Sequence, residues 1–317
     1  MHQYYFNIIG EVCMTNYDNI KDGMNYGLGA ASGYASYKLM PKIFKLPIKH
    51  YLLDTFYKIP KRENDAFYSS AVKAYENSFL SKPRNIKGIK HAEIIHVDIF
   101  NKDEVYQEIA KRWLPKSKKC IINQNWFKRI FVDKYKMLEK HLDVVSNGKN
   151  AFCVPRLKDK SSLVVLNKDK MGFSTFHELG HAVNAQSHGY KKFLNVMRGP
   201  IALLIPLTLI TGLLTNRSDD ENSDMGKFIN GLKDNSGLIA AACTVPTIAE
   251  EGVASINAAK LAKGVLDKDL YKKLNKLNAK AWCSYLLSAV VIGSAVEFSV
   301  KLRYKIVESK PVQKIFN

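Results

Sequence analysis

The sequence His177-Glu178-Leu179-Gly180-His181 has the pattern H-E-x-x-H, with which many metallopeptidases hold a zinc ion beside a general base. Residues four apart lie on one face of an α-helix, so the imidazoles of His177 and His181 can reach a single cation. Glu178 points about 100° away from His177 and can accept a proton from an attacking water. The motif therefore predicts a helix that carries a zinc-dependent hydrolytic site.

The residues around the motif favour a helix. Four apolar residues form a stripe at helical spacing: Phe173, Phe176, Leu179 and Val183. Asn167 or Asp169 is expected to cap the start of this helix, and residues 188–189 to end it. A capping box at Thr175 would begin the helix late. The chain has only eight histidines, which disfavours the alternative of two histidines that merely pack in a core.

Composition limits the classes of partner. The chain has 317 residues, 46% hydrophobic residues and a formal net charge of +19, a charge that suits nucleic acid or an anionic membrane surface. The basic residues are mostly lysines spread along the chain, without aromatic–basic interleaving or a nucleic-acid motif. We therefore expect membrane lipids as partners and no nucleic acid.

The cysteines indicate free thiols. Their number is odd and no two form a C-x-x-C pair: Cys13, Cys120, Cys153, Cys243 and Cys283. This pattern is typical of a reducing compartment rather than of a disulfide framework. The first residues lack a basic flank followed by an apolar core, so no signal peptide is expected.

Three uncharged apolar runs follow the motif: 199–215, 236–249 and 281–296. Each is shorter than the ~20 residues of a straight transmembrane helix. Together they predict an integral or tightly associated membrane protein. The alternative is a set of helices buried in a large soluble core.

The N-terminal region is also expected to contact a membrane. Residues 24–37 are uncharged, with Gly29 and Gly33 at the G-x-x-x-G spacing that lets helices approach closely. A re-entrant segment and a tightly packed soluble helix fit this run equally well. Residues 47–59 are expected to form a basic amphipathic helix at a bilayer surface, or a solvated face over an ordinary core.

Loop charge suggests an orientation. Residues 216–235 carry more acidic than basic residues, whereas the segments that flank the expected hairpin 199–249 are basic. By the positive-inside tendency, the active site is expected to face the cytoplasm. If residues 281–296 also span the membrane, the basic C-terminal tail would emerge on the side opposite to the cytoplasm, against the same tendency. Either that run does not cross the membrane, or the N-terminal segment changes the number of spans.

The segment from 63 to 170 is expected to be mixed α/β, with a helix over 124–142. Three segments have strand character: 92–100, 151–155 and 161–167. The last is expected to offer an exposed edge to an extended peptide substrate. Three residues would then bind the substrate backbone: Leu163, Val164 and Val165.

A catalytic zinc needs a third protein ligand and one open position. Glu250 and Glu251 are candidates, because they stand together where the second apolar run ends and a helix is expected to begin. A charged helix N-terminus is the plain alternative.

The chain resembles the membrane gluzincins of the CAAX prenyl protease and HtpX heat-shock protease type. In these proteins H-E-x-x-H is followed, after a long insertion, by E-x-x-A-D, which residues 251–255 match with Ser255 in place of the aspartate. Their preceding strand often reads N-A-F and then proline, as residues 150–155 do. The resemblance covers residues 150–260. It implies that Glu251, rather than Glu250, is the third ligand.

The resemblance also implies a fold and a function. The fold expected is α+β and mainly helical, a zincin-like domain with apolar membrane-embedded helices. The function expected is that of a zinc-dependent endopeptidase with one Zn²⁺ per chain, which cleaves a peptide or protein substrate with Glu178 as base. In the family the aspartate orients a metal-binding histidine, and Ser255 would do so more weakly. A catalytically impaired membrane scaffold is therefore the alternative function.

The family's downstream His-Pro element is missing, which leaves four weak candidates for an oxyanion-stabilising group: His188, Tyr190, Arg198 and Tyr285. Four regions are expected: 1–62 contacts the membrane, 63–198 is the zincin-like region, 199–249 is the apolar hairpin, and 250–317 holds the third ligand, an apolar helix and a basic tail.

Overall fold

The computed structural model describes residues 59–78, 80, 91–113, 134–154, 161–187, 189–214 and 222–307, besides positions 31 and 35. The chain divides into two compact units, each built from separate segments. The sheet unit comprises 49–199 and 246–285. The helical unit comprises 1–48, 200–245 and 286–317. The segments expected at 24–37 and 47–59 fall almost entirely outside the described residues.

The described part of the sheet unit contains a three-stranded sheet in the order β1-β3-β2. Strand β1 (Ala92–His96) runs parallel to β3 (Ser162–Leu166), and β2 (Ala151–Val154) runs antiparallel to β3. All three strands lie within the segments that the sequence predicts. The prediction of an exposed edge at 161–167 is wrong, because β3 pairs on both sides. Leu163, Val164 and Val165 are completely buried, and the edge strand near the motif is β2.

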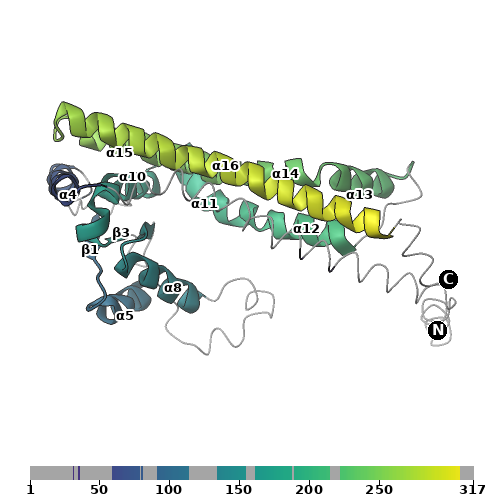
Figure 1. The fold of residues 1–317 in the computed structure, drawn as a ribbon, viewed down its shortest axis with the longest axis horizontal. Helices are drawn as coiled ribbons and strands as arrows, with labels where there is room; N and C mark the ends of the chain where they lie inside the picture. Colours follow the sequence, from purple (N-terminus) through teal and green to yellow (C-terminus); the bar gives the residue numbers. More distant parts are fainter. Residues whose placement is uncertain are drawn as a thin grey trace. The chain divides into compact units, whose positions relative to one another are not determined.

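The alternation of side chains along the strands builds a core on each face of the sheet. Leu163 and Val165 pack with α5 (Lys102–Trp113) and α8 (Lys134–Ser146). Val164 and Leu166 pack on the other face with α4 (Lys61–Glu76) and α10 (Thr175–Gln186). Helix α10 therefore lies over one face of the sheet, whereas α5 and α8 cover the opposite one (Figure 1).

The chain reaches the motif through two short elements. Asn167 caps the helix α9 (Lys168–Met171), because its side chain accepts a hydrogen bond from the Asp169 amide at 3.2 Å. A 3₁₀ turn, η2 (Gly172–Ser174), follows, and α10 begins only at Thr175. The predicted cap at Asn167 thus belongs to a preceding helix, and the later start at Thr175 is the one observed.

The rest of the described chain is helical. The elements in order are α11 (Tyr190–Ala202), α12 (Leu204–Leu214), α13 (Asp224–Asp234), α14 (Ser236–Ala242), α15 (Val245–Ala262) and α16 (Lys268–Val307). Breaks before α12 and α15 place Pro206 and Pro246 in the first turn of a helix, where a proline ring is tolerated, whereas Pro200 lies inside α11. The expected polar loop at 216–235 contains α13, which Ser223 caps.

In the described residues, three helical stretches are long and apolar enough to cross a membrane. They are Tyr190–Leu214 with 25 residues, Ser236–Ala262 with 27 and Lys268–Ile306 with 39. Each covers one of the uncharged runs, apart from residue 215, which lies outside the described residues. Helical turns that carry charged residues extend each run to this length. Apolar side chains are also exposed on the helical unit: Leu203, Leu204, Leu207, Ile210, Leu214, Leu238, Leu286, Leu287 and Val290. Such a surface favours lipid contact.

The helical unit has its own core. Leu209 and Leu213 of α12 pack with Ala240 of α14 and with Val296 and Val300 of α16. The α14 and α16 backbones also lie close together, since a Cβ atom on Gly293 would stand 2.7 Å from the Gly237 carbonyl oxygen. The class expected from the sequence, α+β and mainly helical, is confirmed. The cysteines within the described residues, Cys153, Cys243 and Cys283, are free thiols.

An ion pair joins β1 to α5 and gives the sheet unit a testable pH dependence. Arg112 donates hydrogen bonds of 2.7 and 2.8 Å to the two carboxylate oxygens of Glu93. These bonds hold the pKa of Glu93 below its usual value, although burial partly opposes them. The resulting stabilisation is present above the unfolded-state pKa and is lost as the pH falls through the lower folded-state pKa.

We expect Glu93→Gln to lower the free energy of unfolding by about 1 kcal/mol at neutral pH. The difference from wild type should shrink as the pH falls below ~4, which thermal unfolding in detergent at several pH values would measure. Glu104→Gln, which changes an exposed acid in the first turn of α5, is the control. A difference that grows with acidity would contradict the assignment.

Candidate metal centre

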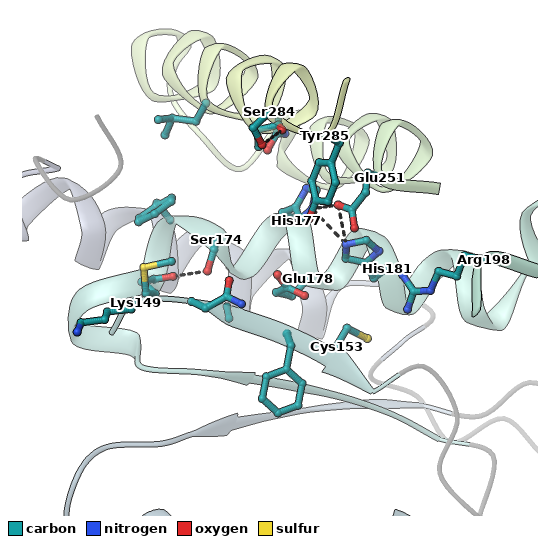
Figure 2. A pocket seen from close by; sticks show the side chains of 18 residues that line it. Lys149, Cys153, Ser174, His177, Glu178, His181, Arg198, Glu251, Ser284 and Tyr285 are labelled. Atoms are coloured by element: carbon teal, nitrogen blue, oxygen red, sulfur yellow. Dashed lines mark hydrogen bonds and ion pairs between the residues drawn. The ribbon is translucent and has the colours of Figure 1, made fainter. Parts of the chain in front are cut away.

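Two helices bring three ligand atoms together. His177 and His181 lie on α10, Glu251 lies on α15, and each offers one ligand atom to the group. The two Nε2 atoms are 3.1 Å apart, and Glu251 Oε2 lies 3.1 Å from His177 Nε2 and 3.4 Å from His181 Nε2. The rings stand edge to face at 90°. Figure 2 shows the carboxylate and both imidazoles pointing at one another.

The spacing of these atoms fits a metal ion. Four-coordinate zinc with bonds of about 2.0–2.2 Å places its ligand atoms about 3.3–3.5 Å apart, close to the distances observed. Each histidine meets a protein oxygen through Nδ1, which leaves Nε2 to face the centre of the group. Neutral imidazole with one nitrogen held in this way is the usual form of a metal-binding histidine. The His-His-Glu group can therefore hold a metal ion.

Gly180 sets the distance between the two helices. A Cβ atom at this position would lie 2.1 Å from the Ala254 carbonyl oxygen of α15. The backbones of α10 and α15 thus meet where a side chain cannot fit, one residue before His181 and three residues after Glu251. Glu251 can reach both imidazoles because of this contact.

Glu250 holds the other side of His181. Its Oε1 atom lies 2.9 Å from His181 Nδ1, on the far side of the ring from the ligand group. This carboxylate is completely buried, and Arg198 donates a hydrogen bond of 2.9 Å to its Oε2 atom. Asn184 donates to Oε1 at 3.2 Å. Glu250 was the alternative third ligand, but the structure places it behind His181, where it orients the ring.

Ser255 lies beside His177, the other histidine of the ligand group. Its hydroxyl oxygen is 3.4 Å from His177 Nδ1, a long contact compared with that of Glu250 to His181. Asn278 of α16 donates to the Ser255 carbonyl oxygen at 3.5 Å. The serine is therefore brought to the histidine that it was expected to orient, but the stronger orienting contact in this site is made by Glu250.

Glu178 lies buried next to the ligand group and lines the same cavity. Burial raises the pKa of Glu178, and the neighbouring His181 and His177 partly oppose that rise. Burial lowers the pKa of His181, because it disfavours a charge on the ring. Hydrogen bonds to Glu250 and Glu251 outweigh this effect, so the pKa of the ring lies well above its usual value. A metal must displace a proton from this ring, so binding weakens at low pH.

A cavity of about 330 Å³ opens beside these residues. Five consecutive residues line it, of which the last three belong to β2: Lys149, Asn150, Ala151, Phe152 and Cys153. Successive side chains of a strand point to opposite faces, so this unbroken run means that β2 presents its edge to the cavity. Leu163, Val164 and Val165 are absent from the lining, since they lie within the central strand.

The four candidates for an oxyanion-stabilising group differ in whether the structure places them in the cavity. Arg198 and Tyr285 line the cavity, and the Tyr285 side chain hydrogen-bonds to Glu251. Tyr190 is 63% exposed and is not part of the lining. His188 lies outside the described residues. Tyr285 of α16 is thus the candidate that the structure brings to the ligand group (Figure 2).

Sequence reasoning missed two features of this site. The sequence does not reveal the position of Glu250, because adjacent helical residues point about 100° apart. Only the rotation of α15 about its axis decides which of the two carboxylates faces the imidazoles. The strand next to the cavity was misassigned, although the N-A-F segment that drew attention to 150–155 was a usable signal. No protein-family model, curated protein or solved structure matches this chain.

We expect Gly180→Ala to separate α10 from α15. The added methyl group meets backbone rather than a flexible side chain, so the free energy of unfolding should fall by about 2 kcal/mol, with a marked loss of zinc affinity. Thermal unfolding and zinc titration of the purified protein measure both effects. Gly199→Ala is the matched control, because nothing lies within 4 Å of a Cβ atom there. Equal behaviour of the two variants would contradict the role of Gly180.

Glu250→Gln should keep the zinc site but weaken it. Loss of the carboxylate behind His181 is expected to lower zinc affinity by about 10–100-fold, whereas Glu251→Gln should abolish stoichiometric binding because it removes a ligand. Metal analysis after dialysis against graded chelator concentrations measures the difference. If Glu250→Gln lost zinc completely while Glu251→Gln retained it, Glu250 would be the ligand.

Proposed function

We propose that this protein is a zinc-dependent, membrane-associated endopeptidase of the gluzincin type. The observation that carries the proposal is the convergence of His177, His181 and Glu251 beside a buried Glu178, in a cavity bounded by the edge of β2. A metal group, a carboxylate base and a strand edge that can bind an extended chain are the parts that peptide hydrolysis needs.

The protein groups have distinct roles in this proposal. Zinc, when held by the two histidines and Glu251, supplies a Lewis acid that polarises the substrate carbonyl and lowers the pKa of water. Glu178 accepts a proton from the attacking water, whose oxygen bonds to the carbonyl carbon, and then passes that proton to the amide nitrogen. The C–N bond breaks to give a carboxylic acid and an amine, and the acid proton then passes to the amine.

The edge of β2 replaces the segment 161–167 as the expected substrate strand. Residues 151–153 of β2 line the cavity, so a peptide can add to this edge of the sheet. The lining continues on both sides of Glu178, with Lys149 on one side and Arg198 on the other (Figure 2). A chain can therefore extend in both directions, which favours cleavage within a polypeptide over removal of a terminal residue.

The membrane assignment belongs to the same proposal. Three helical stretches that can cross a bilayer and the exposed apolar side chains of α12 support membrane embedding. The resemblance to the CAAX prenyl protease and HtpX type and the cytoplasmic orientation of the site rest on the sequence.

The alternative of a catalytically impaired scaffold rests on Ser255 in place of an aspartate. The contact of Glu250 with His181 supports an active site instead, because it orients a metal-binding histidine.

Glu178→Gln should separate metal binding from catalysis. The amide has the shape of the acid but cannot accept the proton, so zinc content should match wild type while hydrolysis falls by at least about 100-fold. Metal analysis and cleavage of an unfolded protein such as casein, both in detergent, measure the two properties. Glu139→Gln, at an exposed position of α8, is the control.

Two results would contradict this proposal. Hydrolysis by Glu178→Gln at the wild-type rate would exclude Glu178 as the base. Native protein that never takes up stoichiometric zinc would favour the scaffold.

A further inference from the structure

Helix α11 turns a polar face toward the residues behind His181 and an apolar face outward. We propose that the bilayer regulates the metal centre through this helix: lipid holds the apolar face, the polar face fixes His181, and membrane contact therefore tightens zinc binding. The inference rests on the metal binding and the membrane embedding of the proposed function, and not on peptide hydrolysis.

The polar face of α11 consists of three residues at helical spacing, Lys191, Asn195 and Arg198, which are called the inner face. Arg198 donates a hydrogen bond of 2.9 Å to Oε2 of Glu250, and Asn195 donates a longer one of 3.5 Å to its Oε1. Lys191 donates to Asn257 Oδ1 at 3.4 Å. The inner face thus contacts two residues of α15.

Both of these α15 residues lead to His181. The Glu250 carboxylate lies 2.9 Å from His181 Nδ1. Asn184 donates to the same carboxylate at 3.2 Å and accepts a hydrogen bond of 2.6 Å from Asn257. Figure 2 shows Arg198 next to His181. Because the group that holds the second nitrogen of a metal-binding histidine tunes metal affinity, the position of α11 should affect zinc binding.

Apolar packing does little to fix α11 in the sheet unit. All 13 of its residues are described, and none of them is buried. Among the described residues, neither core of the sheet unit takes a side chain from this helix. The inner face therefore supplies its main contacts, and a hydrogen bond contributes only about 1 kcal/mol. A second attachment would strengthen the hold on His181.

The opposite side of α11 is apolar and exposed. Tyr190, Phe193 and Val196, which are called the outer face, recur every three residues and are 63%, 59% and 52% exposed. At about 100° per residue they lie almost opposite the inner face. A helix on the surface of a soluble protein has the reverse arrangement, with its apolar stripe toward the core. The outer face therefore suits an apolar environment.

Lipid is the partner that the rest of the stretch indicates. The outer face begins the 25-residue stretch Tyr190–Leu214, which is long and apolar enough to cross a membrane. Exposed apolar side chains continue along it: Leu203, Leu204, Leu207, Ile210 and Leu214. The outer face is thus the start of a longer apolar series, and we assign lipid acyl chains to it.

An added tryptophan tests the lipid contact. Phe193→Trp and the control Met137→Trp each replace an exposed apolar residue of a helix in the sheet unit. The wild type measures the three native tryptophans. All three proteins are placed, at full length, in phosphatidylcholine nanodiscs with or without bromine on the acyl chains. We expect the brominated lipid to quench the added fluorescence at position 193 and not at 137.

Absence of quenching at position 193 would overturn the inference. If each disc then held two chains, the outer face would be assigned to a second copy of the protein instead of lipid.

Phe193→Asn tests whether lipid contact controls the metal centre. A polar side chain loosens the outer face from lipid, so zinc should bind about tenfold more weakly in nanodiscs. Phe193→Leu keeps the face apolar and should bind zinc like wild type. Met137→Asn, on the exposed side of α8, is the matched control. Competition with a fluorescent chelator measures zinc affinity. Equal affinity of Phe193→Asn and wild type, or equal losses in both Asn variants, would overturn the inference.

Arg198→Gln tests the path from the outer face to His181. This variant should weaken zinc binding by at least about tenfold, and adding Phe193→Asn should weaken it little further, because both changes act on one contact. An unchanged affinity of Arg198→Gln, or losses that multiply in the double variant, would overturn the inference.

These measurements separate the inference from the proposed function. A zinc-loaded wild-type protein without hydrolytic activity would overturn the proposed function, while the fluorescence and the zinc affinities would still decide the role of α11. Wild-type protein that binds no zinc in nanodiscs would overturn both.

Discussion

The contact between α10 and α15 at Gly180 and Ala254 is the constraint on which the metal centre depends. Backbone meets backbone there, since even a Cβ atom would lie 2.1 Å from the Ala254 carbonyl oxygen. A motif of two histidines on one helix supplies two ligands at most from its own face. The third ligand has to come from another element at a fixed distance, and the missing side chain of Gly180 sets that distance.

The buried charges around His181 are arranged so that each has a partner. Glu250 lies between the imidazole and the guanidinium of Arg198, so its negative charge is compensated on both sides, as a buried carboxylate requires. Glu251 faces the ligand group, where a cation would compensate it. The two carboxylates are thus adjacent in sequence but contact different nitrogens of the same ring: Glu250 lies 2.9 Å from Nδ1 of His181, and Glu251 lies 3.4 Å from its Nε2.

The sequence predicts the part of this site that is local. His177, Glu178 and His181 lie within little more than one helical turn, so their relation follows from helix geometry alone. The assignment of Glu251 as the third ligand depends on the resemblance to a known family, because no spacing rule connects residues from different helices. The order of the strands and the role of Glu250 depend on tertiary packing. For that reason the sequence alone predicts an edge strand at 161–167 and leaves Glu250 as a possible ligand. The uncharged runs predicted the three long helices but not their lengths, because charged residues extend each helix beyond its uncharged run.

The adjacent positions of Glu250 and Glu251 also limit how the chain between the two halves of the site can vary. What matters at α15 is its rotation about its own axis, because a turn of about 100° exchanges the residue that faces the ligand group for the one that faces Arg198. Chain length between Arg198 and Val245 does not set this rotation. One residue inserted between Glu251 and Ala254, in contrast, turns both carboxylates by about 100° relative to the helix contact at Gly180.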